Sequence, residues 1–258
     1  MMQSKQLSWS RSMLVLMILF SNTLIAQDYK ASLEGITKVR IISETTLQIK
    51  PSNTDLLIIK ESENNRNNTP EKPEGLKSMG SFESDNTGYG VYLTKVGSVL
   101  SLKGLRDRTS EDLVVNIPRD MDISLEIIDN NDIYLEGFTS TVEAKVHNGG
   151  IYLKNVTGPI VAENKVGEIS VVFGELNQSY PMSIVSMNGD IDISIPSGAK
   201  ANVTVKVPRG DFMTDFDVNR KEDFEGRVAR SIQTKINGGG VELMLHTLKG
   251  NIYLRKIK

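Results

Sequence analysis

The chain has 258 residues, no cysteine and a formal net charge of −2 at pH 7. Without cysteine it can form no disulfide bond and has no thiolate for catalysis or metal binding. The mildly acidic balance, with no basic stripe, argues against nucleic acid as a partner. The length suits one solenoid or sandwich domain with a sizeable core.

Residues 1–26 have the three parts of a secretory signal peptide. Lys5 and Arg11 give a basic start, an apolar run covers 13–20, and Leu24-Ile25-Ala26 offers a cleavage point. The apolar run is short for a membrane span, which favours a cleaved signal over the alternative, an uncleaved anchor. We therefore expect an exported mature chain without a transmembrane anchor, with 28 basic and 32 acidic residues and a net charge of −4.

Short apolar strands follow the signal. Alternating aliphatic residues predict strands at 36–42, 45–49, 56–59, 113–117 and 123–128. The segments 91–96 and 99–102 flank Gly97-Ser98, which predicts a hairpin. No stretch after the signal has the spacing of an amphipathic helix, so the expected fold class is all-β.

Two polar stretches interrupt these strands. Residues 61–88 are rich in asparagine and contain Pro70 and Pro73 but few aliphatic side chains. Such a segment cannot bury enough apolar surface to offset its ordering cost, so we expect a long surface loop or disorder. Residues 214–230 form a charged insertion between later strands.

The most informative stretch, Asn130 to Val171, repeats itself. Asn130-Asn131-Asp132-Ile133-Tyr134-Leu135 returns as Asn148-Gly149-Gly150-Ile151-Tyr152-Leu153, and Ile133, Ile151 and Ile169 are 18 residues apart. Apolar triplets lie halfway between these units, at 142–144 and 160–162. Looser copies of the unit follow at 165–171, 188–193, 238–243 and 250–254.

Each repeat combines a turn with a strand that has one buried face. Alternation of Ile and Leu around an outward residue has the period of a strand, and Asn-Gly or Gly-Gly supplies the preceding corner. A fixed period of 18–22 residues is typical of a solenoid in which each coil stacks on the last. We therefore predict a single β-solenoid or β-helix-like domain over 27–258. An antiparallel β-sandwich is the alternative, since it also has short, regularly spaced strands.

The C-terminal run carries a family resemblance. Ile236-Asn237-Gly238-Gly239-Gly240-Val241-Glu242-Leu243, followed by Gly250-Asn251-Ile252-Tyr253-Leu254, resembles the closing motif of the bacterial putative-adhesin family of β-strand repeats (the DUF4097 and head-GIN group). The resemblance covers about 110–258 well and 27–109 weakly. It implies a β-helix-like fold, export and a role in the cell envelope, and it brings no catalytic residues.

The residues offer few candidates for metal or phosphate chemistry. His147 and His246 are the only histidines and are far apart in sequence, so they do not predict a zinc site. Acidic pairs at turns, Asp190 with Asp192 and Asp129 with Asp132, lack the glycine-aspartate nonapeptide of calcium-binding β-rolls. We expect no metal and no cofactor.

Three classes of function remain open. An envelope binding or structural module, adhesin-like, would contact a glycan, an envelope protein or its own copies. A sensor or regulatory ectodomain would act with a membrane partner. A polysaccharide lyase or hydrolase would need clustered acids with a basic residue, or a facing carboxylate pair. No arginine occurs between Asp120 and Pro208, and among the outward triplet positions no acid pair falls one coil apart, so we expect no enzyme.

The candidate ligand-binding residues are Tyr134 and Tyr152. They hold the same outward position one coil apart, so a solenoid would place their rings on neighbouring strands about 4.8 Å apart. Exposed aromatic rings offer an apolar face with a hydroxyl group to a sugar or to a partner's side chain. Such cross-strand pairs also stabilise sheets without any ligand. Whether or not the tyrosines bind a ligand, we expect the exported protein in the periplasm, on the outer surface or in the secreted fraction.

Overall fold

The computed structural model describes residues 28–60, 84–105, 112–218 and 231–257. The expected signal peptide at 1–26 lies outside these ranges, as do most of the polar loop at 61–88 and of the insertion at 214–230. Every regular element in the described ranges is a β-strand, which confirms the all-β class.

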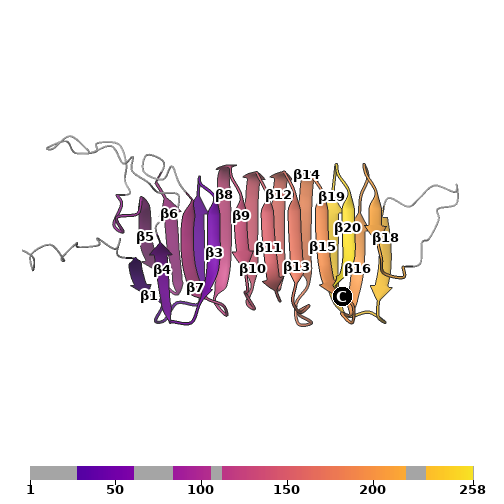
Figure 1. Cartoon of the computed structure of the whole chain (residues 1–258), viewed down its shortest axis with the longest axis horizontal. Helices are drawn as coiled ribbons and strands as arrows, with labels where there is room; N and C mark the ends of the chain where they lie inside the picture. Colours follow the sequence, from indigo (N-terminus) through magenta and orange to yellow (C-terminus); the bar gives the residue numbers. More distant parts are fainter. Residues whose placement is uncertain (1–27, 61–83, 106–111, 219–230, 258) are drawn as a thin grey trace, which may run out of the picture.

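The strands form two ten-stranded sheets that run the length of the molecule (Figure 1). Sheet A contains β1 (Tyr29–Ser32), β3 (Leu47–Ser52), β4 (Leu56–Lys60), β7 (Leu113–Pro118), β9 (Ile133–Glu136), β11 (Ile151–Val156), β13 (Ile169–Phe173), β15 (Ile191–Pro196), β17 (Phe212–Thr214) and β20 (Ile252–Ile257). Sheet B contains β2 (Lys38–Ser43), β5 (Val91–Val96), β6 (Val99–Gly104), β8 (Asp122–Asn130), β10 (Val142–Asn148), β12 (Ile160–Val166), β14 (Met182–Asn188), β16 (Ala201–Lys206), β18 (Ser231–Ile236) and β19 (Val241–Thr247).

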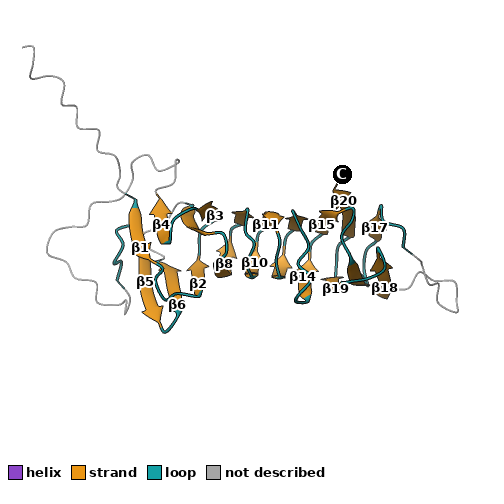
Figure 2. Cartoon of the chain, turned by 90° about the horizontal axis from the view of Figure 1, so that it is seen from below, coloured by secondary structure: helices purple, strands orange, loops and turns teal. Residues whose placement is uncertain are grey.

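Each successive coil contributes one strand to sheet A and one strand to sheet B. The two layers are visible side-on in Figure 2. Ile151 lies in register between Ile133 and Ile169, and all three are fully buried. On the other sheet Val142 pairs with Ile160 in a parallel ladder. Alternate side chains of both sheets form one apolar core. The parallel ladders confirm the predicted solenoid, and the antiparallel sandwich is wrong for the body of the molecule.

A column of glycines forms the corner where five sheet B strands turn into sheet A, namely Gly149, Gly167, Gly189, Gly210 and Gly250. Gly167 has a φ of 126°, and its amide donates to the carbonyl of Asn188 in the next coil at 2.9 Å. A Cβ at position 167 would collide with the carbonyl of Gly149 in the preceding coil, and Gly189 meets Gly167 in the same way. The coils that meet at these glycines can therefore approach to strand spacing only because position 167 or 189 carries no side chain.

Coils at the two ends do not stack in chain order, so that part of the prediction is wrong. The final pair, β19 and β20, is inserted between β14–β15 and β16–β17. At the other end, β2 and β3 lie between β6–β7 and β8–β9. Every inserted strand pairs in parallel with both neighbours, because a coil of the same length and pattern fits at any level of the stack.

Antiparallel strands close the ends. The predicted hairpin is confirmed as β5–β6, which ends sheet B at the N-terminal end. On sheet A the same end is closed by β1, β4 and β7 in antiparallel order. At the C-terminal end β18 pairs antiparallel with β16, while the three-residue β17 follows β20 in parallel.

Candidate functional site

Tyr134 and Tyr152 lie side by side on the outer face of sheet A. Tyr134 is on β9 and pairs in register with Tyr152 on β11. Their ring centroids are 5.0 Å apart and the ring planes differ by 11°, so the rings are stacked. Tyr134 is 44% exposed and Tyr152 is half-buried. The sequence therefore predicted the position and the spacing of this pair, while its use by a ligand stays a prediction.

The residue two positions before each tyrosine sets the tilt of its ring. The Tyr134 hydroxyl donates to Asp132 Oδ2 at 3.0 Å. Gly150 has no side chain, and the Tyr152 ring fills the space that a Cβ there would take. Both rings consequently lean along their strands towards the glycine corner. The second glycine of the Asn-Gly-Gly repeat is thus explained by the tyrosine that follows it.

The surroundings of the pair keep both hydroxyls protonated. Desolvation by burial, followed by the hydrogen bond and the charge of Asp132, raises the pKa of Tyr134 to about 12. Desolvation and the charges of Glu168 and Asp132 also raise the pKa of Tyr152. Over the physiological pH range the pair therefore presents neutral rings beside a carboxylate-bearing corner.

The aromatic row stops after two rings and resumes further along the sheet. Parallel pairing places Ser170, Asp192 and Tyr253 in succession beyond Tyr152. Arg255 donates three hydrogen bonds to Asp192, from Nε to Oδ1 at 2.8 Å and to Oδ2 at 3.1 Å, and from Nη2 to Oδ2 at 2.9 Å. The Arg255 guanidinium also lies 5.1 Å from the centroid of the Tyr253 ring. One free face of the tyrosine pair therefore borders a strand with a small outward side chain.

The acidic residues at the corners link successive coils. Asp132 Oδ1 accepts the Gly150 amide at 2.6 Å, and Asp190 Oδ1 accepts the Asn251 amide at 2.8 Å. Asn251 Oδ1 in turn accepts the Asp211 amide at 3.0 Å. These side chains satisfy backbone donors at the start of the next sheet A strand, where the parallel ladder has not yet begun. Within the described ranges, no group of three or more acidic or histidine side chains is placed to hold a metal ion.

Comparison with protein families identifies this architecture. The family model described as Toastrack DUF4097 matches residues 127–255, which is half of the chain. The chain belongs to the DUF4097 family. The match confirms the resemblance seen in the closing Gly-Gly-Gly and Gly-Asn-Ile-Tyr repeats. It starts in β8 and ends in β20, so it includes the inserted final coil and leaves out β1 to β7.

Comparisons with individual proteins give little more. No curated protein matches the chain. The crystal structure of a putative cell adhesion protein from Clostridium sporogenes ATCC 15579 is similar, with a TM-score of 0.40 and 9% sequence identity. The similarity covers 90% of this chain and 100% of that one.

The two histidines of this DUF4097 protein lie on sheet B, away from the tyrosines. His147 is on β10 and His246 is on β19, with β12 and β14 between these strands. Both side chains are half-buried on the outer face. They are too far apart to share a ligand.

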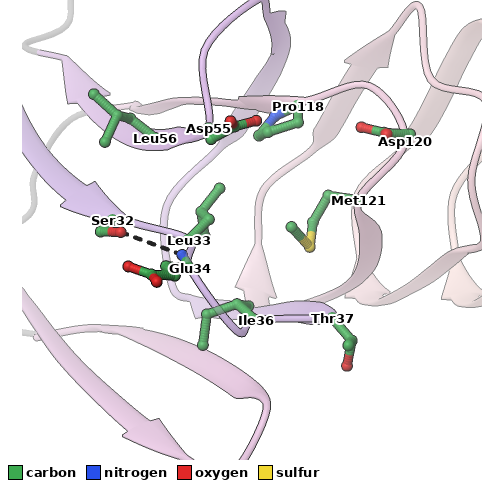
Figure 3. A pocket seen from close by; sticks show the side chains of 10 residues that line it. All are labelled: Ser32, Leu33, Glu34, Ile36, Thr37, Asp55, Leu56, Pro118, Asp120 and Met121. Atoms are coloured by element: carbon green, nitrogen blue, oxygen red, sulfur yellow. Dashed lines mark hydrogen bonds between the residues drawn. The ribbon is translucent and has the colours of Figure 1, made fainter.

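A hollow that the sequence did not indicate lies near the N-terminal end, where loops of β1–β2 and β7–β8 meet (Figure 3). It is an open hollow of about 650 Å³. Its lining combines apolar and acidic side chains with no basic one, namely Ser32, Leu33, Glu34, Ile36, Thr37, Asp55, Leu56, Pro118, Asp120 and Met121. The chain segments that meet there are up to 89 residues apart, from Ser32 to Met121, so no local motif could have predicted it.

Proposed function

We propose that this DUF4097 protein is an exported, non-catalytic binding or structural module of the cell envelope, adhesin-like in role. Its contact surface is the outer face of sheet A around Tyr134 and Tyr152, and its partner is a glycan or an envelope protein. In the described ranges, no helix is long and apolar enough to cross a membrane.

The stacked tyrosine pair carries this proposal. Two rings with centroids 5.0 Å apart form a rigid aromatic block whose position is fixed by parallel strand pairing and by the bond to Asp132. Beyond Tyr152, the small Ser170 leaves room beside the ring face. Sugar rings pack well on such faces, and the neighbouring carboxylates can accept hydrogen bonds from hydroxyl groups.

The positions of the acids support a non-catalytic role. A glycosidase needs a pair of carboxyl groups free to hold a proton and to stabilise positive charge. Asp132 and Asp190 instead accept backbone amides between coils, and Asp192 is held by Arg255. These acids already have structural partners, so a substrate would have to displace them.

The test is to incubate the purified protein with a panel of glycans and to measure binding and cleavage together. Tyr134→Ser with Tyr152→Ser should abolish glycan binding, whereas Tyr134→Phe with Tyr152→Phe should keep the ring faces and most of the affinity. Tyr180→Ser is the matched control, because Tyr180 is 64% exposed and lies on a loop away from this face. If the double serine variant binds as well as the parent, the tyrosine site is wrong. Cleavage of any glycan would refute the non-catalytic assignment.

Export is tested separately by intact-mass measurement of protein isolated from its native compartment. We expect loss of residues 1–26, which also removes Trp9, the only tryptophan. The mature protein should then show tyrosine emission alone. A mass that retains residues 1–26 would contradict the cleaved signal.

A further inference from the structure

The two edge strands of sheet B, β5 and β18, differ in whether the backbone groups on their outer edge are hydrogen-bonded. At the N-terminal end, the side chain of Asn86 folds over the outer edge of β5. Its Oδ1 accepts the Leu93 amide and its Nδ2 donates to the Leu93 carbonyl, both at 2.8 Å. Thr87 Oγ1 donates to the Val91 carbonyl at 3.1 Å. These backbone groups are occupied, so they cannot pair with the strand of another molecule.

Asp85 holds this cover in place. Its carboxylate accepts the amides of Thr87 and Gly88 at 2.9 Å and that of Gly90 at 3.0 Å. These hydrogen bonds hold residues 85–90 in a fixed conformation over the edge of β5, and we call this segment the guard loop. Sheet A needs less protection, because its own edge strands β1 and β17 have only four and three residues.

The C-terminal edge of sheet B is built in another way. β18 has six residues and is the last strand of the sheet, with β16 on its inner side. In the part of the chain that the structure describes, no strand pairs with its outer edge. Its inward Ile232 and Thr234 remain half-buried, while Ser231, Gln233 and Lys235 are exposed. The strand therefore offers both backbone groups and uncovered apolar surface to a further strand.

We propose that β18 pairs antiparallel with β18 of a second copy of this chain, around a two-fold axis perpendicular to sheet B. With Thr234 at the centre of the pair, Ile232 of one copy faces Ile236 of the other on the core side. On the outer side Lys235 faces Gln233 in both directions. Sheet B would then continue without interruption through both molecules.

The sequence of β18 suits a partner identical to itself. In this register its only charged residue, Lys235, avoids the lysine of the partner, since like charges directly opposite one another destabilise a sheet. A central Thr–Thr pair and two Ile–Ile pairs are favourable cross-strand neighbours. A two-fold contact uses the same patch on both copies and closes on itself.

The guard on β5 explains why the assembly would stop at a dimer. A head-to-tail contact between β18 and β5 would not close and would generate filaments. Asn86 and Thr87 block that contact by occupying the backbone of β5. The dimer would also present both Tyr134–Tyr152 faces on the same side, which would add avidity if the proposed binding function holds. The dimer itself does not depend on that function.

The experiment measures mass against concentration up to about 1 mM by light scattering or sedimentation of the purified protein. We expect the mass to rise towards twice that of one chain. Gln233→Lys would set lysine against Lys235 twice and should weaken the dimer about tenfold, whereas Gln233→Glu should strengthen it by a similar factor. Both changes lie on an exposed side chain, so the fold should survive them. Asn53→Lys and Asn53→Glu, at an exposed turn near the other end, control for the change in net charge.

Two results would overturn the proposed dimer, and a third would overturn the protection of β5. The parent and Gln233→Glu could both remain monomeric at the highest concentration. A dimer could form that responds equally to the Gln233 and Asn53 substitutions, which would place the contact elsewhere. Asn86→Ala with Thr87→Val should free β5 and give assemblies larger than the dimer; if only dimers persist, β5 is not guarded in the way described.

Discussion

The middle and the ends of this solenoid differ in the order of their coils and in the direction in which their strands pair. From β8 to β15 the chain lays down one coil after another, with parallel ladders in both sheets and a glycine at the corners that follow β10, β12 and β14. At the ends, coils are inserted out of chain order and antiparallel strands close the sheets. A repeated pattern is enough to build a uniform stack, but ending the stack requires features that do not repeat.

The corner glycines should give the largest effect, and only in the stack. Gly167→Val places a side chain against the Gly149 carbonyl at a φ of 126°, so unfolding free energy should fall by about 4 kcal/mol or more. Gly198 lies in an open turn where a Cβ meets nothing within 4 Å, and Gly198→Ala should stay within about ±0.5 kcal/mol. Chemical denaturation of both variants checks this. Equal losses would mean that the corner is not a close contact.

Core truncations should rank the middle above the end. Ile151→Ala should cost about 2–5 kcal/mol because Ile151 is fully buried between two coils. Ile232→Ala, on the half-covered edge strand β18, should cost about 1 kcal/mol. Ile252→Ala should match Ile151→Ala if the inserted coil is packed as tightly as the middle. A much smaller loss at Ile252 would show that the insertion is loose.

An outward charge should matter least within the stack. Glu143 points outward on β10, and its carboxylate lies 2.8 Å from Lys38 Nζ on β2. Both side chains are partly exposed, so Glu143→Ala should cost at most about 1 kcal/mol. Glu163→Ala on the neighbouring β12 is the control, because Glu163 is exposed and should stay within about ±0.5 kcal/mol. Urea titration of the two variants, with added salt, measures the difference.

The guard loop should make the N-terminal end sensitive to acid. Burial raises the pKa of Asp85, but hydrogen bonds from Thr87, Gly90 and Gly88 outweigh it and hold the pKa below its ordinary value of 3.8. The stabilisation is therefore complete above pH 3.8 and is lost as the pH falls through the lower folded value. As the pH falls through this range, the hydrogen exchange of β5 should rise before that of β11. Asp85→Asn should remove this dependence of β5 exchange on pH. Simultaneous loss in both strands would contradict a local guard.

The tyrosine pair should respond only to strong alkali. Because the folded pKa of Tyr134 is about 12 against an ordinary 10.0, its contribution to stability is complete below pH 10 and is lost as the pH rises towards 12. Absorbance titration should show a tyrosine that ionises near pH 12 and disappears in Tyr134→Phe. The same titration of Tyr180→Phe, at an exposed position, should keep the late step.

Much of the fold follows from the sequence alone, because a strand with one buried face and a corner glycine are local requirements. The 18-residue spacing of Ile133, Ile151 and Ile169 determined the parallel register, and with it the stacking of Tyr134 on Tyr152. The hairpin at β5–β6 followed from Gly97-Ser98 between two apolar segments in the same way.

Only the tertiary structure decided the order of the coils at the ends. β17 and β20 carry the same alternation, and parallel strands offer the same backbone groups along their edges. The sequence therefore cannot state which of these two strands lies next to β15. The roles of Asp132 and Asp190 were equally hidden, because an acid at a turn has the same local pattern whether it binds calcium or the amide of the next coil. Those choices depend on contacts between residues far apart in the chain, and such contacts leave no periodic signal.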